Sequence, residues 1–125
     1  MSQQYQHVIN FIKQVREVEL PNNFTPLTSQ NKFDRYHYML EELQEFLAAE
    51  KAHDEIDAII DLCYFAYGAL AEMGINKNQF EAIFNRVHEA NMLKKAGKKE
   101  GRNVNGTDAY KPEGWQEPNF DDILK

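Results

Sequence analysis

The chemistry of this chain is concentrated in two segments that are rich in carboxylates. The first, YHYMLEELQEFL, contains Glu41, Glu42 and Glu45, and the second, HDEIDAIIDLCYFAYGAL, contains Asp57 and Asp61. The second segment is apolar on nearly every side, as is typical of a buried helix. Carboxylates are unfavourable in such surroundings unless a positive charge meets them. Because the candidate ligands are all oxygens, the pattern predicts a hard cation, Mg²⁺ with Mn²⁺ as a substitute.

Helical geometry places these acids on arcs that can face each other. At about 100° per residue, the three glutamates fall on one arc beside the apolar stripe of their helix. Asp57 and Asp61 are four residues apart and therefore share a face. Asp54 falls on the same arc, but near a helix start an acid has an ordinary capping role. We therefore expect the metal ligands to be Glu42, Glu45, Asp57 and Asp61.

A plainer interpretation remains open for part of this pattern. The EELQE run by itself is typical of a solvated acidic helix face. Asp57 and Asp61 favour the metal site more strongly, because aspartate is a poor helix former and their neighbours are apolar. Glu50 and His53 have a spacing known from di-iron bundles, but this spacing lies at a helix boundary and is interpreted as a coincidence.

Four helices are expected to position these residues. Apolar periodicity predicts them over about 4–18, 30–50, 53–73 and 77–96, with Gly74 and Gly97 as stops and Asn76 as a cap. The segment from about 97 to 125 contains Tyr110, Trp115 and Phe120, which suggests a tail lying on a surface. The predicted fold is all-α, most simply a four-helix bundle with an irregular C-terminal tail, in one domain spanning 1–125.

Bulk composition narrows the classes of function. A length of 125 residues suits one domain, and a net charge of −6 argues against binding to polymeric nucleic acid or to an anionic membrane. No stretch reaches the roughly 18 uncharged apolar residues of a membrane span. The start of the chain does not resemble a secretory signal, and the lone Cys63 cannot form an internal disulfide. These features favour a cytoplasmic location.

A cationic segment follows the fourth expected helix. It contains five basic residues within nine positions, namely Lys94, Lys95, Lys98, Lys99 and Arg102. Taken alone, it is typical of a solvated helix end, where cations interact well with the helix dipole. Beside a metal site it becomes a candidate phosphate clamp, because a metal together with lysines is suited to holding polyphosphate.

Four segments together resemble the all-α nucleotide pyrophosphohydrolases, the group that includes MazG, the dimeric dUTPases and phosphoribosyl-ATP pyrophosphohydrolase. The acidic helices are represented by RYHYMLEELQEF and DAIIDLCYFAYGALAEMGI, and the later segments by FNRVHEANMLK and YKPEGWQEPNFDDIL. The resemblance covers most of the chain. It identifies Glu41, Glu42 and Glu45 with the metal-binding glutamates of the group, one of which would act as the base.

The resemblance also assigns the rest of the site. Asp61 corresponds to the last residue of a Glu-x-x-Asp motif whose glutamate position is Ala58 here, and Asp57 is expected to take its place. The remaining site residues fall into two classes. The expected phosphate contacts are Asn91, Lys94, Lys95, Arg35 and Lys111, and the base is expected among Tyr64, Tyr67, Tyr110 and Trp115, chiefly at Tyr64 and Trp115.

The implied activity is hydrolysis of a nucleoside triphosphate, or a related nucleotide, between the α- and β-phosphates. Phosphoribosyl-ATP and dUTP are rival substrates within the same class. A non-catalytic helical binding or oligomerisation module and, less favoured, a di-iron carboxylate bundle are the alternatives. Because the third helix is apolar on so many sides, we expect a homodimer or a tetramer made of two dimers.

Overall fold

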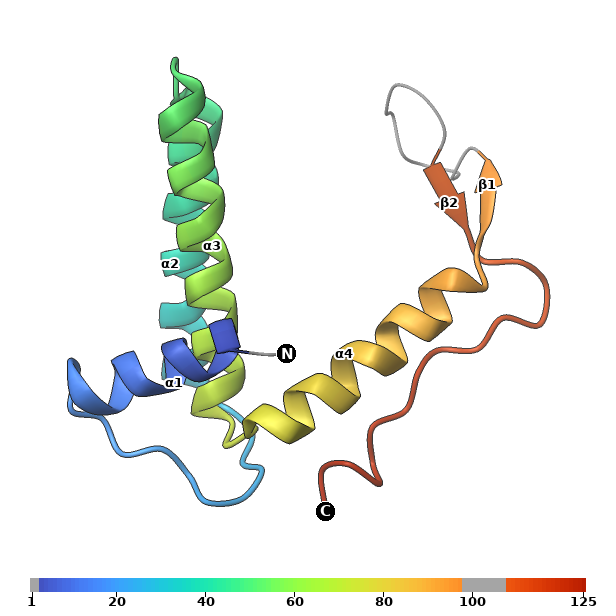
Figure 1. Ribbon diagram of the computed structural model, residues 1–125, viewed down its shortest axis with the longest axis horizontal. Coiled ribbons are helices and arrows are strands. Elements are labelled where there is room, and N and C mark those ends of the chain that lie inside the picture. Colours follow the sequence, from blue (N-terminus) through green and yellow to red (C-terminus); the bar gives the residue numbers. More distant parts are fainter. Residues whose placement is uncertain (1–2, 98–107) are drawn as a thin grey trace.

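The computed structural model describes residues 3–97 and 108–125, in which four helices are followed by one short β-hairpin (Figure 1). Three basic residues of the cationic segment, Lys98, Lys99 and Arg102, lie outside these ranges. The predicted all-α class with four helices is confirmed for the described residues. The hairpin is a small addition that the sequence did not predict.

Helix α1 (Gln3–Gln14) forms because its apolar residues recur at helical spacing. Tyr5, Val8, Ile9 and Ile12 are its buried residues. The predicted extension of this helix to residue 18 is wrong. The backbone turns left-handed at Glu17, with φ of 55°, and the Val18 amide donates back to the Ile12 carbonyl at 3.1 Å. Such a closure ends a helix by satisfying its last carbonyls.

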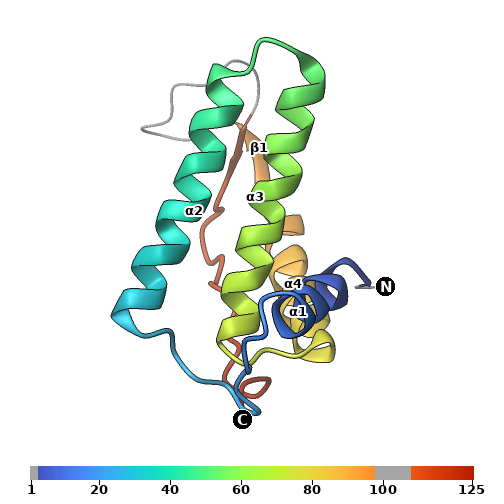
Figure 2. The same ribbon diagram turned by 90° about the vertical axis from the view of Figure 1, so that its left-hand side faces the viewer.

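Helices α2 (Ser29–Ala48) and α3 (Ala52–Glu72) form a long antiparallel hairpin (Figure 2). The side chain of Thr28 caps α2 by accepting a hydrogen bond from the Asn31 amide at 3.1 Å. Both helices begin and end within one or two residues of their predicted limits, which is the usual uncertainty of helix ends. The two acidic segments therefore lie on neighbouring antiparallel helices.

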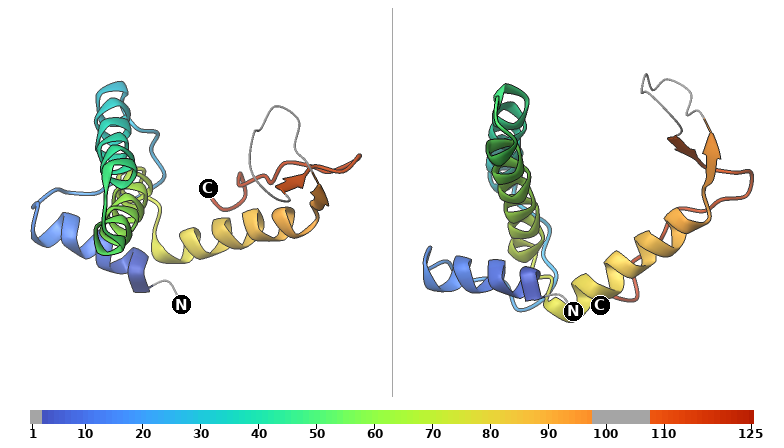
Figure 3. Two further views of the ribbon diagram at one scale, coloured as in Figure 1. Left: turned by 90° about the horizontal axis from the view of Figure 1, so that it is seen from above. Right: turned by 45° about the horizontal axis from the view of Figure 1, so that its top comes forward.

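The turn after α3 sends the chain in a new direction. Gly74 has φ of 77°, and a Cβ there would lie 3.0 Å from the Asn23 carbonyl carbon, so glycine is required. Asn76 and Gln79 then form a capping box that starts α4 (Lys77–Met92). The axes of α3 and α4 bend by 115°, so that α4 and the α2–α3 hairpin form the two arms of an open V (Figures 1 and 3).

Helix α4 ends at Met92, earlier than predicted, because the chain leaves it for a strand. Strand β1 (Lys95–Gly97) pairs antiparallel with β2 (Asp108–Tyr110), and Lys95 lies opposite Tyr110. Gly97, predicted as a helix stop, instead lets the Tyr110 ring pack closely on the strand, since a Cβ there would lie 2.9 Å from the ring. Strands of three residues are too short to show alternation in the sequence.

The core lies where α1 meets the end of α3 and the start of α4. Tyr5 is fully buried, its hydroxyl donates to the Ile75 carbonyl at 2.6 Å, and its ring stacks on Phe80 at 4.3 Å. Tyr67 from α3 meets both rings edge-on. The burial of the Tyr5 hydroxyl raises its pKa above the ordinary value. This cluster holds the base of the V together.

Both arms of the V expose large apolar side chains. On the hairpin they are Phe33, Tyr36, Leu43, Phe46, Leu47, Ile56, Ile59 and Ile60, and on α4 and its end they are Phe84, Val87, Met92 and Leu93. The sequence predicted α3 to be buried nearly all round, but within one chain Ile56 is 64% exposed. The expectation of a second subunit that covers this face stays a prediction. Among the described residues no single helix is long and apolar enough to cross a membrane, and α3 and α4 meet that criterion only as a sharply bent pair.

Candidate active site

Four carboxylates face one another across the α2–α3 hairpin. Burial is the main reason that the pKa of Glu42 rises from 4.5 to about 7, and a hydrogen bond shared with the Glu45 carboxyl adds to it. Repulsion from Glu45, Asp61 and Asp57 raises it further. One oxygen of Glu42, Oε2, is buried and has no hydrogen-bond partner among the described residues. The four predicted ligands are thus close enough for the other three to raise the pKa of Glu42.

Asp61 is affected by the same group of carboxylates. Burial raises its pKa, and repulsion from Asp57 and Glu45 adds to the rise. Clusters of carboxylates that raise one another's pKa are frequent at functional sites, because a cation or a transferred proton relieves their repulsion. Within residues 3–97 and 108–125, however, no three acidic, histidine or cysteine side chains are close enough to form a ready ligand group. The predicted metal site therefore remains a prediction.

An open cavity of about 350 Å³ lies beside this acidic cluster, toward the tip of the hairpin. It is lined by Glu45 and Asp57 together with Asp54, Ala58 and the last residues of α2. Asp54 was not counted among the ligands, although the helical wheel put it on the same arc. Its side chain is exposed, and it shares the cavity with two of the predicted ligands. Ala58, where the resembling group has glutamate, is buried and lines the same cavity.

The predicted basic and aromatic residues form a second cluster, at the end of α4. The ammonium groups of Lys94 and Lys111 lie 5.2 Å and 5.0 Å from the centre of the Trp115 ring. The indole N–H of Trp115 donates to the Ala90 carbonyl at 2.6 Å, which ties the ring to the helix. Lys111 also pairs with Glu117 at 2.6 Å. Cation–π contacts of this kind hold both lysines beside a flat apolar surface.

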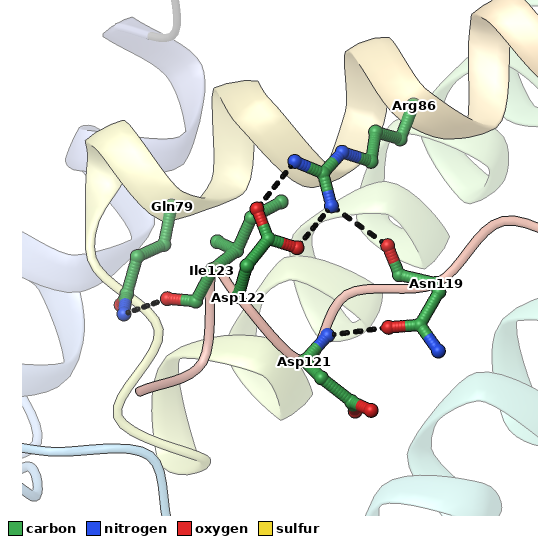
Figure 4. A network of polar contacts seen from close by, with 6 residues as sticks. All are labelled: Gln79, Arg86, Asn119, Asp121, Asp122 and Ile123. Carbon is green, nitrogen blue, oxygen red and sulfur yellow. Dashed lines mark hydrogen bonds and ion pairs between the residues drawn. The ribbon is translucent and has the colours of Figure 1, made fainter.

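The C-terminal tail is fastened along α4 by hydrogen bonds (Figure 4). The guanidinium of Arg86 pairs with both carboxylate oxygens of Asp122, at 2.7 Å for Nη2, and donates from Nη1 to the Asn119 carbonyl at 2.8 Å. The Gln79 amide donates to the Ile123 carbonyl at 3.1 Å. The hydrogen bond from Arg86 lowers the pKa of Asp122 to about 2. Sequence reasoning missed this contact, because its partners are far apart in the chain.

The other residues that were predicted to contact phosphate lie in different environments. Asn91 is exposed on α4, and Lys95 is exposed on β1. Arg35 is buried, with 4% of its surface exposed, and forms an ion pair with Glu72. Its Nη1 donates to the Phe65 carbonyl at 3.3 Å, whereas Nη2 has no partner among the described residues. Its predicted contact with phosphate stays a prediction.

The two chief candidates for base binding lie in different parts of the molecule. Tyr64 of α3 packs edge-on against Phe11 at 5.4 Å and lines a cavity of about 250 Å³ between α1, α2 and α3. Trp115 belongs to the lysine cluster of the tail. Tyr67 is part of the aromatic core, and Tyr110 packs on Gly97. The sequence alone could not separate these environments.

The acidic and basic clusters do not meet within one chain. Helix α4 packs on α1, and it meets α3 near its start, where Phe80 contacts Tyr67. Figures 1 and 3 show the end of α4 and the hairpin on opposite arms of the V. The predicted metal ligands therefore lie on the α2–α3 hairpin, whereas Lys94, Lys111 and Trp115 lie together at the end of α4.

Two comparisons with known proteins bear on this arrangement. A search of curated proteins finds no match. The profile of a family described as phosphoribosyl-ATP pyrophosphohydrolase matches residues 7–91. The matched region includes α2, α3 and nearly all of α4, and thus contains the whole acidic cluster. Because the match covers more than half of the sequence, this chain belongs to the phosphoribosyl-ATP pyrophosphohydrolase family.

Proposed function

We propose that this pyrophosphohydrolase cleaves a nucleotide triphosphate, such as phosphoribosyl-ATP or a nucleoside triphosphate, between its α- and β-phosphates with the help of Mg²⁺. The products are the monophosphate and pyrophosphate. Membership of the family favours an enzyme over a non-catalytic module. The observation that carries the proposal is the convergence of Glu42, Glu45, Asp57 and Asp61 on adjacent helices.

These carboxylates fit a hard divalent cation in their chemistry. The buried and unpartnered Oε2 of Glu42 is an acceptor that lacks a donor, and the mutual repulsion of the cluster would be relieved by positive charge. Glu42, Glu45, Asp57 and Asp61 would hold the ion. When bound, it supplies charge neutralisation for the triphosphate and a lowered pKa for a coordinated water.

The remaining residues accept protons and orient the substrate. Glu41, exposed next to the cluster, is available to accept the proton of the attacking water. The water oxygen bonds to the α-phosphorus, the bond from that phosphorus to the bridging oxygen breaks, and pyrophosphate leaves with the bridging oxygen. Lys94 and Lys111 are suited to neutralise that leaving group, and the face of Trp115 or Tyr64 is suited to stack on the base.

A nucleotide panel tests this function. The protein with Mg²⁺ should release pyrophosphate, and not orthophosphate, from phosphoribosyl-ATP, dUTP or another triphosphate. Asp61→Asn should abolish release while the circular dichroism spectrum stays helical, whereas Glu50→Gln, outside the cluster, should retain it. Full activity of Asp61→Asn would refute the site, and inactivity of the wild type across the panel would refute the function.

Metal binding has an independent test. A cation that binds only the folded state must stabilise it. Adding Mg²⁺ or Mn²⁺ should therefore raise the Tm of the wild type, and the rise should be smaller in Asp61→Asn. An equal rise in both proteins would show that the cation binds elsewhere.

A further inference from the structure

The base of the α2–α3 hairpin contains a buried ion pair that has no part in the proposed chemistry. Arg35 of α2 is 4% exposed, and its Nε pairs with the carboxylate of Glu72 at the end of α3. Its Nη1 donates to the Phe65 carbonyl at 3.3 Å. One side chain of α2 therefore contacts α3 at two points that are seven residues apart, and these contacts resist sliding of one helix along the other.

The glycine at position 68 provides the space for this side chain. A Cβ there would lie 2.9 Å from the guanidinium carbon of Arg35, closer than packed atoms approach. Gly68 is the only glycine of α3, and the positions one turn away are Tyr64 and Glu72, which carry large side chains. Sliding α2 by one turn, about 5.4 Å, would therefore place the guanidinium against a side chain. The gap accepts Arg35 in one register.

The gap and the carboxylates lie on the same stripe of the hairpin. Arg35 precedes Glu42 by seven residues on α2, and Gly68 follows Asp61 by seven residues on α3. Seven residues are about two helical turns, so the members of each pair share nearly the same face of their helix. Because the helices are antiparallel (Figure 2), the register that seats Arg35 on Gly68 also sets Glu42 opposite Asp61. Burial raises the pKa of Glu42, and repulsion from Asp61 adds to the rise, which agrees with this placement.

The carboxylates themselves oppose this register. All four members of the acidic cluster carry the same charge, and sliding or separation of the helices would relieve their repulsion. A buried ion pair adds little net stability compared with apolar residues of similar size, but it can select one arrangement of helices among several. The Arg35–Glu72 pair is therefore better explained by register than by stability.

We propose that Arg35 is a positioning residue which, seated on Gly68 and paired with Glu72, sets the register of α2 against α3 and so holds Glu42 opposite Asp61 for a divalent cation. This inference rests on the proposed function for the identity of that cation. It gives Arg35 a role that does not require a nucleotide, in contrast to the predicted contact with phosphate.

The affinity for Mn²⁺ in the absence of nucleotide tests the proposal. In Arg35→Met with Glu72→Met, apolar side chains replace the pair, so the protein should stay folded with a Tm close to that of the wild type. The register is then no longer fixed, and the Kd for Mn²⁺, measured by electron paramagnetic resonance, should rise about tenfold or more. An unchanged Kd in the folded double variant would overturn the proposal.

Two single substitutions keep the proposal falsifiable if the double variant does not fold. Gly68→Ala retains every carboxylate and both members of the ion pair but fills the gap, so the Kd for Mn²⁺ should rise. Arg35→Lys retains the charge, but a single ammonium group cannot reach both Phe65 and Glu72, so its Kd should rise as well. Wild-type values of Kd in both single variants would overturn the proposal.

Tyr5→Phe is the matched control for a loss of stability. It removes the buried hydrogen bond to the Ile75 carbonyl, at the base of the V, and should lower Tm without changing the Kd for Mn²⁺. If Kd rises in Tyr5→Phe as much as in Gly68→Ala, Mn²⁺ affinity follows stability alone and the positioning role is wrong. An unchanged Kd for Mn²⁺ with a raised KM in Arg35→Lys would instead indicate contact with phosphate and would also overturn the proposal.

The inference and the proposed function fail in different ways. Release of pyrophosphate by the wild type, together with unchanged Mn²⁺ affinity in the variants, overturns the positioning role and leaves the enzymatic function standing. Inactivity of the wild type on every nucleotide, with Mn²⁺ affinity that falls in the variants, overturns the function and retains the positioning role. A wild type that binds no Mn²⁺ would overturn the positioning role whatever its activity.

Discussion

At the scale of single residues, the carboxylates of α2 and α3 perturb one another's ionisation, most clearly at Glu42 and Asp61. Glu42 is the most perturbed of them, because burial and three like-charged neighbours disfavour its ionised form. A glutamate with a pKa of about 7 is half ionised near neutral pH, so its charge responds to a cation, a proton or a substrate. Through the ionisation of Glu42, the stability of the protein should therefore depend on both pH and metal binding.

We predict that the metal-free protein loses stability as pH rises through the range in which Glu42 ionises. The folded-state pKa of about 7 lies above the ordinary value of 4.5, so between these values the folded protein binds more protons than the unfolded chain. The free energy of unfolding should therefore fall from about pH 4.5 to about pH 7, by about 1 kcal/mol or more. Urea unfolding in EDTA measures this, and Glu42→Gln should flatten the curve.

Added Mg²⁺ should oppose this decline, because a cation binds the ionised carboxylates and competes with the proton. The stabilisation by Mg²⁺ should thus grow as pH rises through about 7. An identical pH profile in the wild type and in Glu42→Gln would show that another group is responsible.

A second prediction at this scale concerns the glycine beneath Arg35. A Cβ at position 68 would lie 2.9 Å from the guanidinium carbon of Arg35, which is buried and paired with Glu72. Gly68→Ala should therefore destabilise the fold by about 1–3 kcal/mol, because a packed core side chain must move. In an Arg35→Met, Glu72→Met background the same change should cost less, and chemical denaturation of the four proteins measures this coupling. Equal costs in both backgrounds would contradict the packing role.

At the scale of elements, the tail and α4 behave as one structural unit. The tail has almost no regular structure, yet Trp115, Asn119, Asp122 and Ile123 all contribute contacts that hold it on the helix. As a consequence Lys111, which lies on the tail, and Lys94, which follows the helix, both stay beside the Trp115 ring.

We predict that Asp122→Asn loosens this attachment. Losing the paired carboxylate leaves Arg86 with weaker partners, so chymotrypsin should cleave after Phe120 and Trp115 several times faster than in the wild type. Asp121→Asn is the matched control, because the carboxylate of Asp121 makes no drawn contact in the tail network (Figure 4). The attachment should also be fully present above the ordinary aspartate pKa of 3.8 and weaken as pH falls from there through about 2, where the paired Asp122 takes up its proton. Equal cleavage of the two variants would exclude the Arg86–Asp122 pair as the main fastening.

At the scale of the whole molecule, the open V leaves two apolar arms and a divided set of site residues. We expect a second copy of the chain to cover the apolar arms. A homodimer or a tetramer made of two dimers was predicted from the apolar character of α3, and the exposed side chains of both arms support it.

We predict that the wild type sediments as a particle larger than the 14.6 kDa chain. Leu47→Glu should shift it toward the monomer and should reduce pyrophosphate release in parallel, because a charge at this apolar position disfavours docking. Val15→Glu is the control, since Val15 is an apolar residue that is 67% exposed just after α1, on neither arm of the V. A wild-type particle of 14.6 kDa would remove the basis of this prediction.

The sequence alone determined the helices and the acidic arcs, because both depend on residues a few positions apart. Spacing of three and four residues decided where α2 and α3 run and placed Glu42, Glu45, Asp57 and Asp61 on faces that meet once the hairpin forms. Only the tertiary structure decided that Arg35 lies in a buried ion pair, that the tail is tied to α4, and that α4 diverges from the hairpin. Each of these depends on contacts between residues distant in sequence, such as Tyr5 with Phe80 or Arg86 with Asp122, which no local pattern encodes.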